Sequence, residues 1–431
     1  MDNNRTSAYY TLMDIENNLA YSNIALRSHI RRGKPDTPAF VRELTYGVLK
    51  NRIFLDYVIG NFVKTPIDKL KLSDLTILRM GLYQILFMNS VPDYAAVNES
   101  VDLARRFSTG HDGFVNGVLR QFLRDREYVN PPDREKDEVE YLSVKYSYAP
   151  WIVKLFLESY NSAETEALLA AGNQTPDFTI RVNPLKVTRE ELLRQITQEG
   201  FEVRISERAP QGLLVRGSNL LGSRGYKNGL FSVQDESSQI AAGIVAPQKG
   251  ETIVDVCAAP GGKSFAMAEK MGNRGIIHAW DIYKRKLHQV EQEAKRLGVS
   301  IVQTQTWDAT RVNPDLVGKA DRVLVDAPCS GLGVVRRKPE IKYKESPDNM
   351  KELQKKQLDI LEASSNYVKS GGFLIYATCT ISRQENQKVV SDFLRKNKSF
   401  ERQETVQLLP HIDHTDGFFV CKMRKSESII D

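Results

Sequence analysis

Apolar residues recur at helical spacing through roughly the first 130 residues of this 431-residue chain. Positions three and four residues apart line one face of a helix, so the spacing predicts an all-helical domain over 1–130. The first repeat includes Leu12, Ile15 and Leu19, and Ser73 is expected to cap the third helix. Helices are expected at 8–25, 39–58, 70–88, 94–107 and 113–123.

Beyond a polar segment with two prolines, Val129–Lys136, strand patterns join the helical ones. Helical patterns around Trp151 and over 163–171 precede an apolar run from Phe178 that predicts a strand. This short alternation predicts a small α+β module of the ferredoxin-like type over 140–225. A further helix and two strands are expected at 188–199, 201–205 and 212–215.

Strand and helix patterns alternate regularly in the C-terminal part, after a polar segment from Phe231 in which Asp235 to Ser238 are expected to cap a helix. This alternation predicts a doubly wound, Rossmann-like α/β domain over 226–425. Strands are expected at 252–256, 275–280, 300–304, 321–326, 372–377, 400–406 and 416–423. Helices are expected at 264–271, 284–297, 348–369 and 384–396.

Composition is that of a globular chain, with 41% hydrophobic and 26% charged residues. No run is apolar enough for a signal peptide or a membrane span, so a cytoplasmic location is expected. The four cysteines form no CxxC pair, which indicates neither disulfides nor a metal site. The net charge of +6 is compatible with a nucleic-acid partner. Two basic clusters in the helical domain favour an RNA-facing surface: Arg27, Arg31, Arg32 and Lys34, and Arg105, Arg106, Arg120 and Arg124.

The first strand of the α/β domain ends in a loop of small residues, Cys257-Ala-Ala-Pro-Gly-Gly-Lys263, and a helix follows. Strand, tight loop and helix form the opening of a nucleotide-binding unit. The loop has neither the G-x-G-x-x-G order nor the P-loop spacing, which favours a ligand without phosphates such as S-adenosylmethionine. Asp281 ends the next strand, at the spacing where a carboxylate accepts hydrogen bonds from ribose hydroxyls.

The later strands also end in residues that carry chemistry: Asp308, the run Asp326-Ala-Pro-Cys329, and Cys379. Ligands of such sheets gather at the carboxyl ends of the strands, so two thiols and an acid are expected in one cleft. A thiolate that adds to carbon 6 of cytosine makes carbon 5 nucleophilic, and a neighbouring acid assists at N3. A second thiol then assists release of the product.

Three motifs together resemble the RNA cytosine-C5 methyltransferases of the NOL/NOP/Sun family: Cys257–Lys263, Asp326–Gly331 and Ala377-Thr-Cys379-Thr. The resemblance implies that Cys379 is the nucleophile, that Cys329 acts in product release, and that Asp326 contacts the target base. A serine often stands where this chain has Thr380. Cofactor contacts are implied at Cys257, Ala258, Ala259, Pro260, Gly261, Gly262, Lys263, Asp281, Asp308 and Asp326.

The resemblance extends to the rest of the chain. Phe114–Arg120 is similar to a NusB-type RNA-binding domain, and Arg181-Val-Asn-Pro184 to the small RNA-recognition module of the family. The segments Gly333–Lys342 and Asp416–Phe419 fit as well. A NusB-like domain fused to this catalytic domain implies 16S rRNA of the small ribosomal subunit as the substrate, and no DNA or membrane partner.

Alternatives remain at several points. The chemistry would also suit a tRNA cytosine-C5 methyltransferase, and a vestigial catalytic domain would leave an RNA-binding assembly or antitermination factor. Asp308 could merely cap a turn before Thr310, and Cys257 and Cys421 are expected to be buried thiols without a chemical role. The basic run Arg336–Lys338 is expected to contact RNA phosphates rather than only solvent. The protein is expected to be a monomer.

Overall fold

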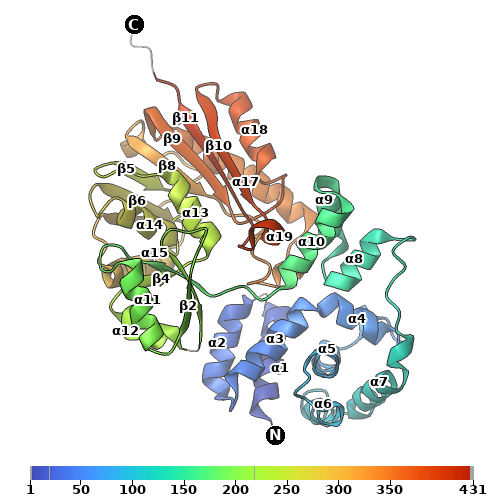
Figure 1. Ribbon diagram of the computed structural model, residues 1–431. Coiled ribbons are helices and arrows are strands. Elements are labelled where there is room, and N and C mark those ends of the chain that lie inside the picture. The colour runs from blue at the N-terminus through green and yellow to red at the C-terminus, as the bar shows by residue number, and fades with distance from the viewer. Residues whose placement is uncertain (1, 19, 218, 428–431) are drawn as a thin grey trace. The chain divides into compact units, whose positions relative to one another are not determined.

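The computed structural model describes residues 2–18, 20–217 and 219–427. The chain forms two compact units (Figure 1). The first joins Met1–Asn173 with Val335–Ser346, and the second joins Gln174–Val334 with Pro347–Asp431. The three predicted domain ranges stay a prediction. No helix among the described residues has the length and apolar character to cross a membrane.

The first unit begins with a bundle of seven α-helices around one hydrophobic core. Helix α5 (Leu72–Phe87) lies at its centre, because its residues are apolar on nearly every side and it packs against α1, α3, α4, α6 and α7. The bundle confirms the predicted all-helical fold. The other helices are α1 (Asn3–Asn18), α2 (Ser22–Gly33), α3 (Pro38–Lys50), α4 (Arg52–Gly60), α6 (Asp93–Phe107) and α7 (Asp112–Asp125).

Two of the predicted helices are each two helices. The range 8–25 divides between α1 and α2, and Leu19 lies outside the described residues. The range 39–58 divides at Asn51, whose backbone leaves the helical region while its side chain donates to the Gly47 carbonyl. Ser73 is not a cap: α5 begins one residue earlier, and the Ser73 hydroxyl lies 3.1 Å from that of Ser108.

Three more helices and a later segment complete the first unit. The helices are α8 (Glu138–Tyr146), α9 (Pro150–Ser159) and α10 (Ser162–Asn173), and the segment Val335–Ser346 contains α16 (Ile341–Lys344). The ammonium of Lys342 is buried and donates to the carbonyls of Lys50 and Tyr146, each at 3.0 Å, and to Asn173. Burial lowers the pKa of Lys342 well below its usual value. This later segment is therefore part of the helical core.

The second unit opens with a four-stranded antiparallel sheet in the order β2-β3-β1-β4. Thr188 caps helix α11 (Arg189–Gln198) in a capping box with Glu191. The prediction of a polar segment from Phe231 was wrong at its start, because Phe231–Val233 forms strand β4 at the edge of this sheet. Phe231 is buried and pairs with Val182, which holds this three-residue strand in the sheet. The others are β1 (Thr179–Val182), β2 (Glu202–Ile205) and β3 (Gly212–Arg216), with helix α12 (Arg224–Lys227).

A seven-stranded sheet in the order β10-β11-β9-β8-β5-β6-β7 forms the rest of the second unit. Neighbouring strands from β9 to β7 are parallel, whereas β11 pairs antiparallel with both β9 and β10. This sheet confirms the predicted Rossmann-like fold. Its strands are β5 (Thr252–Asp255), β6 (Ile276–Asp281), β7 (Val302–Thr306), β8 (Ala320–Asp326), β9 (Val368–Thr378), β10 (Phe400–Leu408) and β11 (Phe418–Lys425).

Helices cover both faces of this sheet (Figure 1). Alternate residues of one strand enter opposite cores, as Val323 and Leu324 of β8 do. One face packs against α13 (Glu236–Val245), α14 (Gly262–Lys270) and α15 (Lys284–Leu297), and the other against α17 (Pro347–Ser365) and α18 (Gln387–Lys396). Helix α17 ends four residues before the predicted limit, because Val368 already pairs with Ala320 in the sheet.

Candidate active site

The turn between β5 and α14 is fixed by its own backbone. The N–H of Ala258 donates to the Trp280 carbonyl and that of Gly261 to the Ala258 carbonyl, both at 2.7 Å. Gly261 has φ of 100°, a conformation that suits glycine, and it precedes α14 without a side-chain cap. The first N–H groups of α14 therefore lack a capping side chain and are available to a polar ligand.

Strand register brings two of the predicted thiols together. Asp326 pairs with Ala377 across the parallel strands β8 and β9, so Cys329 and Cys379 follow at the same edge of the sheet. Their Sγ atoms lie 3.2 Å apart. The hydrogen bond to Cys379, then burial, then the charges of Cys379 and Glu385 raise the pKa of Cys329 well above its usual value. The raised pKa favours the protonated form of Cys329, and either thiol can donate in the contact between the two sulfur atoms.

A partly buried ion pair from two further predicted residues belongs to the same site. Lys263 Nζ lies 2.6 Å from Asp326 Oδ2 and 4.8 Å from the centre of the Phe418 ring. Burial lowers the pKa of Lys263, but the charge and hydrogen bond of Asp326 outweigh it, and Cys379 contributes, so the pKa is raised. Lys263 therefore stays cationic although it is enclosed.

Asp281 and Asp308 differ in how their carboxylates are engaged. Asp281 Oδ1 accepts the Tyr283 N–H at 2.9 Å, and its Oδ2 lies 4.0 Å from Lys286. Asp308 Oδ1 accepts both the N–H and the hydroxyl of Thr310, which hold the pKa of Asp308 below its usual value. The turn before Thr310, one of the two alternatives for Asp308, is thus present. Asp308 Oδ2 lies 3.8 Å from Arg311 Nε.

Cys257 and Cys421 differ in burial: Cys421 is buried, as the sequence predicted, whereas Cys257 is only partly buried. Burial, followed by the charges of Asp255 and Asp326, raises the pKa of Cys257. Cys421 is buried in β11, where burial also raises its pKa and the Thr405 hydroxyl lies 3.6 Å from its sulfur. Among the described residues, which include all four cysteines, no disulfide is formed. The structure thus brings together the two cysteines that the sequence predicted to share a cleft.

Two buried acids in this region were missed by sequence reasoning. Asp255, at the end of β5, accepts the Ser264 hydroxyl at 2.6 Å, and burial raises its pKa to about 7. Glu385 lies just before α18 and accepts hydrogen bonds from Ser330, Gln357 and Thr380. Asp255 could have been predicted as a site residue, because it is an acid at the end of a predicted strand. No spacing in the sequence distinguishes Glu385 from a surface residue.

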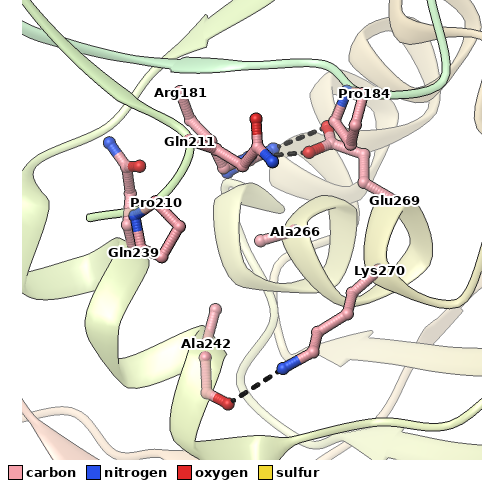
Figure 2. A pocket seen from close by; sticks show the side chains of 10 residues that line it. Arg181, Pro184, Pro210, Gln211, Gln239, Ala242, Ala266, Glu269 and Lys270 are labelled. Carbon is pink, nitrogen blue, oxygen red and sulfur yellow. Dashed lines mark hydrogen bonds and ion pairs between the residues drawn. The ribbon is translucent and has the colours of Figure 1, made fainter. Parts of the chain in front are cut away.

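The Arg181-Val-Asn-Pro184 motif joins the small sheet to the large one. Arg181, 3% exposed, makes a bidentate ion pair with Glu269 of α14 at 2.8 Å (Figure 2). Arg181 also donates to the Gly262 carbonyl at 2.9 Å. Asn183 is also buried and donates to the Leu297 carbonyl. A cavity of about 360 Å³ lies beside this ion pair, and none of the predicted site residues lines it. The motif therefore fixes α14 rather than offering charge to solvent.

Models of known protein families match most of the chain. The family model of the 16S rRNA methyltransferases RsmB/F matches residues 242–424. The NusB family model matches 2–124, and that of the RsmF/B-like ferredoxin-like domain matches 148–219. The solved structure of a protein named PH0851 has a TM-score of 0.82 and 28% identity, covering 97% of this chain and 98% of its own. The structure of NSun6 from Pyrococcus horikoshii, at 24% identity and a TM-score of 0.59 over 64% of this chain and 98% of its own, shares the fold.

Relatives of known name cover nearly the whole chain. The probable ribosomal RNA small subunit methyltransferase B of Bacillus subtilis is 38% identical over 98% of this chain and 98% of its own length. The protein of the same name from Synechocystis is 34% identical over 98% of this chain and 99% of its own. The resemblance found in the motifs is confirmed, and this chain belongs to the family of ribosomal RNA small subunit methyltransferase B.

Proposed function

We propose that this protein transfers a methyl group from S-adenosylmethionine to carbon 5 of a cytosine in 16S rRNA, through a covalent adduct between Cys379 and carbon 6. The observation that carries the proposal is the pair of thiols, 3.2 Å apart at the ends of β8 and β9, in a member of this methyltransferase family. A single thiol would suffice for addition, so the second one favours a reaction with a separate release step.

The proposed reaction begins at the thiols. The Cys379 thiolate adds to carbon 6, and the electrons of the carbon 5–carbon 6 double bond make carbon 5 the nucleophile. After carbon 5 takes the methyl group, a base accepts the proton of carbon 5. The electrons of that C–H bond restore the double bond, and Cys379 leaves carbon 6 as a thiolate. Cys329, in contact with the Cys379 sulfur, assists this release. Asp326, with one oxygen held by Lys263, contacts the N3 side of the base.

The proposed cofactor, S-adenosylmethionine, suits the residues around the Cys257–Lys263 loop and the end of β6. S-adenosylmethionine supplies an electrophilic methyl group and carries an adenosine with two ribose hydroxyls. Asp281 has an oxygen whose nearest cation is 4.0 Å away, and the adjoining Ile282 side chain is 51% exposed, as a surface for an adenine requires. The Cys257–Lys263 loop and Asp308 complete the proposed cofactor contacts, and the uncapped start of α14 adds N–H donors.

RNA binding is proposed for the basic residues of the bundle. Those of the first predicted cluster lie on or just after α2 and are exposed, and no ion pair among the described residues involves them: Arg27, Arg31, Arg32 and Lys34. Exposed, uncompensated cations are what phosphate groups bind. In the run Arg336–Lys338, Arg336 is only 8% exposed, so of these three it is the least suited to the proposed phosphate contact.

The test is transfer of labelled methyl from S-adenosylmethionine to transcribed 16S rRNA, with a denaturing gel of each reaction. Cys379→Ala is expected to lose both methylation and the covalent adduct. Cys329→Ala is expected to leave an adduct that survives denaturation, because release is blocked. The opposite behaviour of the two variants would reverse the roles of the thiols. Transfer only to tRNA would move the function to that substrate, and cofactor binding without transfer would indicate an RNA-binding factor.

A further inference from the structure

Glu385 is a fully buried carboxyl that bonds to both cysteine loops at once. Its Oε1 accepts the Ser330 N–H at 2.8 Å, and its Oε2 accepts the Ser330 hydroxyl at 2.5 Å. The Thr380 hydroxyl donates to the same Oε2 at 3.2 Å. Ser330 directly follows Cys329 and Thr380 directly follows Cys379. One side chain therefore links the residues next to the two thiols.

Glu385 is itself held in place from two sides. Gln357 of α17 donates to its Oε1 at 3.0 Å and to the Pro328 carbonyl at 2.9 Å. The Tyr376 hydroxyl donates to the Glu385 backbone carbonyl at 2.7 Å. Burial raises the pKa of Glu385, while the hydrogen bonds from Ser330 and Gln357 oppose that shift. A carboxyl fixed in this way keeps both loops at a constant separation.

The next residue provides a contrast, because its contacts lie on one of the loops. Asn386 accepts the Thr378 hydroxyl at 2.6 Å and donates to the Thr380 carbonyl at 2.9 Å. These contacts shape the turn around Cys379 and do not reach the Cys329 loop. The Ser330 and Thr380 hydroxyls also lie 3.0 Å apart, and Glu385 Oε2 accepts from both of them. Glu385 therefore joins the two loops together with this hydroxyl contact and holds both hydroxyls in place.

We propose that Glu385 is a positioning residue that sets the separation of the Cys329 and Cys379 sulfur atoms. The catalytic meaning of that separation rests on the proposed function, but the separation itself does not. Addition and release both need the second thiol near the first, and a displacement of about 1 Å costs roughly a hundredfold in rate. Glu385 acts through Ser330 and Thr380 and has no part in proton transfer.

The test compares Glu385→Ala with Glu385→Gln. Alanine removes every bond that the Glu385 side chain makes to the loops and leaves only the contact between the Ser330 and Thr380 hydroxyls. Glutamine keeps an acceptor for the Ser330 and Gln357 N–H groups, and its NH₂ donates to the Ser330 and Thr380 hydroxyls, which rotate to accept. Val389→Ala, a core truncation on α18, controls for general loss of packing. Should Glu385→Ala not fold, the pair Ser330→Ala and Thr380→Val removes the hydroxyl bonds instead.

The first readout is disulfide closure with oxidised glutathione. One cysteine thiolate displaces a glutathione thiol to form a mixed disulfide, and the second thiolate displaces the other glutathione, so two electrons pass to glutathione. The closing step depends on how near the sulfur atoms lie. It is expected to slow roughly a hundredfold in Glu385→Ala and less than about threefold in Glu385→Gln, with Val389→Ala unchanged. Closure at the original rate in folded Glu385→Ala would overturn the proposal.

The second readout is methyl transfer to 16S rRNA by the same variants. Glu385→Ala is expected to lower kcat with little change in KM. Glu385→Gln is expected to retain most of the original kcat. Loss of transfer in Glu385→Gln with normal disulfide closure would assign a proton-transfer role and overturn the positioning role. If even the unaltered protein transfers no methyl group to any RNA, the proposed function fails, while disulfide closure still decides the role of Glu385.

Discussion

At the scale of single residues, the site depends on charges held where water is scarce. Lys263 is enclosed, yet it stays cationic because Asp326 lies 2.6 Å away. Asp255 is enclosed with the Ser264 hydroxyl as its close partner, and its pKa rises to about 7. The two groups flank one loop in sequence and respond to burial in opposite ways, because a serine hydroxyl does not offset burial as an opposite charge does.

Replacement of Lys263 by methionine is expected to reduce kcat/KM for methyl transfer about a hundredfold, the usual loss when one buried electrostatic partner is removed. The Asp326 carboxylate would then stand uncompensated beside the thiols, so the pH profile of the variant should move to higher pH. Lys270→Met, on the same helix, controls for loss of a lysine. An unshifted profile with full activity would show that Lys263 has no electrostatic role.

Asp255 should make the protein less stable as pH rises. Its folded-state pKa of about 7 exceeds the usual value of 3.8, so between these values the folded state binds more protons than the unfolded state. The free energy of unfolding should fall by up to about 4 kcal/mol across this window and then level off. Denaturant titrations of Asp255→Asn are expected to lack this decline, whereas the control Asp348→Asn, whose side chain is 89% exposed, should retain it. Equal slopes in all three proteins would contradict the prediction.

At the scale of elements, three chain segments meet at the Cys379 loop. The Gly333 N–H donates to the Cys379 carbonyl at 3.1 Å, and the Gly417 N–H donates to the Gly333 carbonyl at 2.8 Å. A Cβ at Gly333 would lie 2.1 Å from the Gly417 carbonyl oxygen, closer than any side chain can. The Gly333 and Gly417 segments, which are also part of the family resemblance, thus form a backbone support for the Cys379 loop.

Gly333→Ala is expected to push these segments apart, with a loss of about 1–3 kcal/mol in stability and a larger loss of activity, roughly a hundredfold. Thermal unfolding and methyl transfer on the same preparation would measure both. Gly243→Ala is the matched control, since nothing lies within 4 Å of its added Cβ in α13. Full activity in Gly333→Ala would show that this backbone support does not position the thiol.

The elements show what the sequence could reveal. Periodicity located the strands of the large sheet, and because parallel strands end at one edge, it also predicted that Cys329 and Cys379 would meet. Contacts between segments that are distant in sequence leave no periodic pattern, so they could not be predicted in this way. Three features depend on which distant segments are in contact: the close approach of Gly333 and Gly417, the hydrogen bonds of Glu385, and the short strand β4. The spacing of hydrophobic residues does not predict such contacts.

At the scale of the whole molecule, the order of the chain does not follow the division into units. The chain leaves the second unit after Val334, contributes Val335–Ser346 to the helical unit and returns at Pro347. Lys342 fastens that segment through three acceptor oxygens. The complete helical unit therefore includes a segment that follows the Cys329 loop in sequence, and the chain passes between the two units more than once.

The helical unit also carries the exposed cations proposed to hold the RNA. Replacing Arg27, Arg31, Arg32 and Lys34 by glutamine is expected to weaken binding of 16S rRNA and to raise KM while kcat at saturating RNA stays unchanged, because these residues are proposed to contact phosphates rather than the reacting base. For each phosphate that the variant no longer neutralises, the slope of log Kd against log salt should fall by about 0.7–0.9.

The matched control removes the same charge from exposed positions of the second unit: Lys319, Lys355, Lys398 and Arg402. If net charge alone governed binding, both quadruple variants would show the same decrease in salt dependence. A decrease confined to the helical variant would assign the phosphate contacts to α2 and the residues just after it. Binding by a localised surface depends on which cations are removed, whereas attraction by the net charge depends only on the number removed. A normal salt slope in the helical variant would move the RNA-binding surface to another part of the molecule.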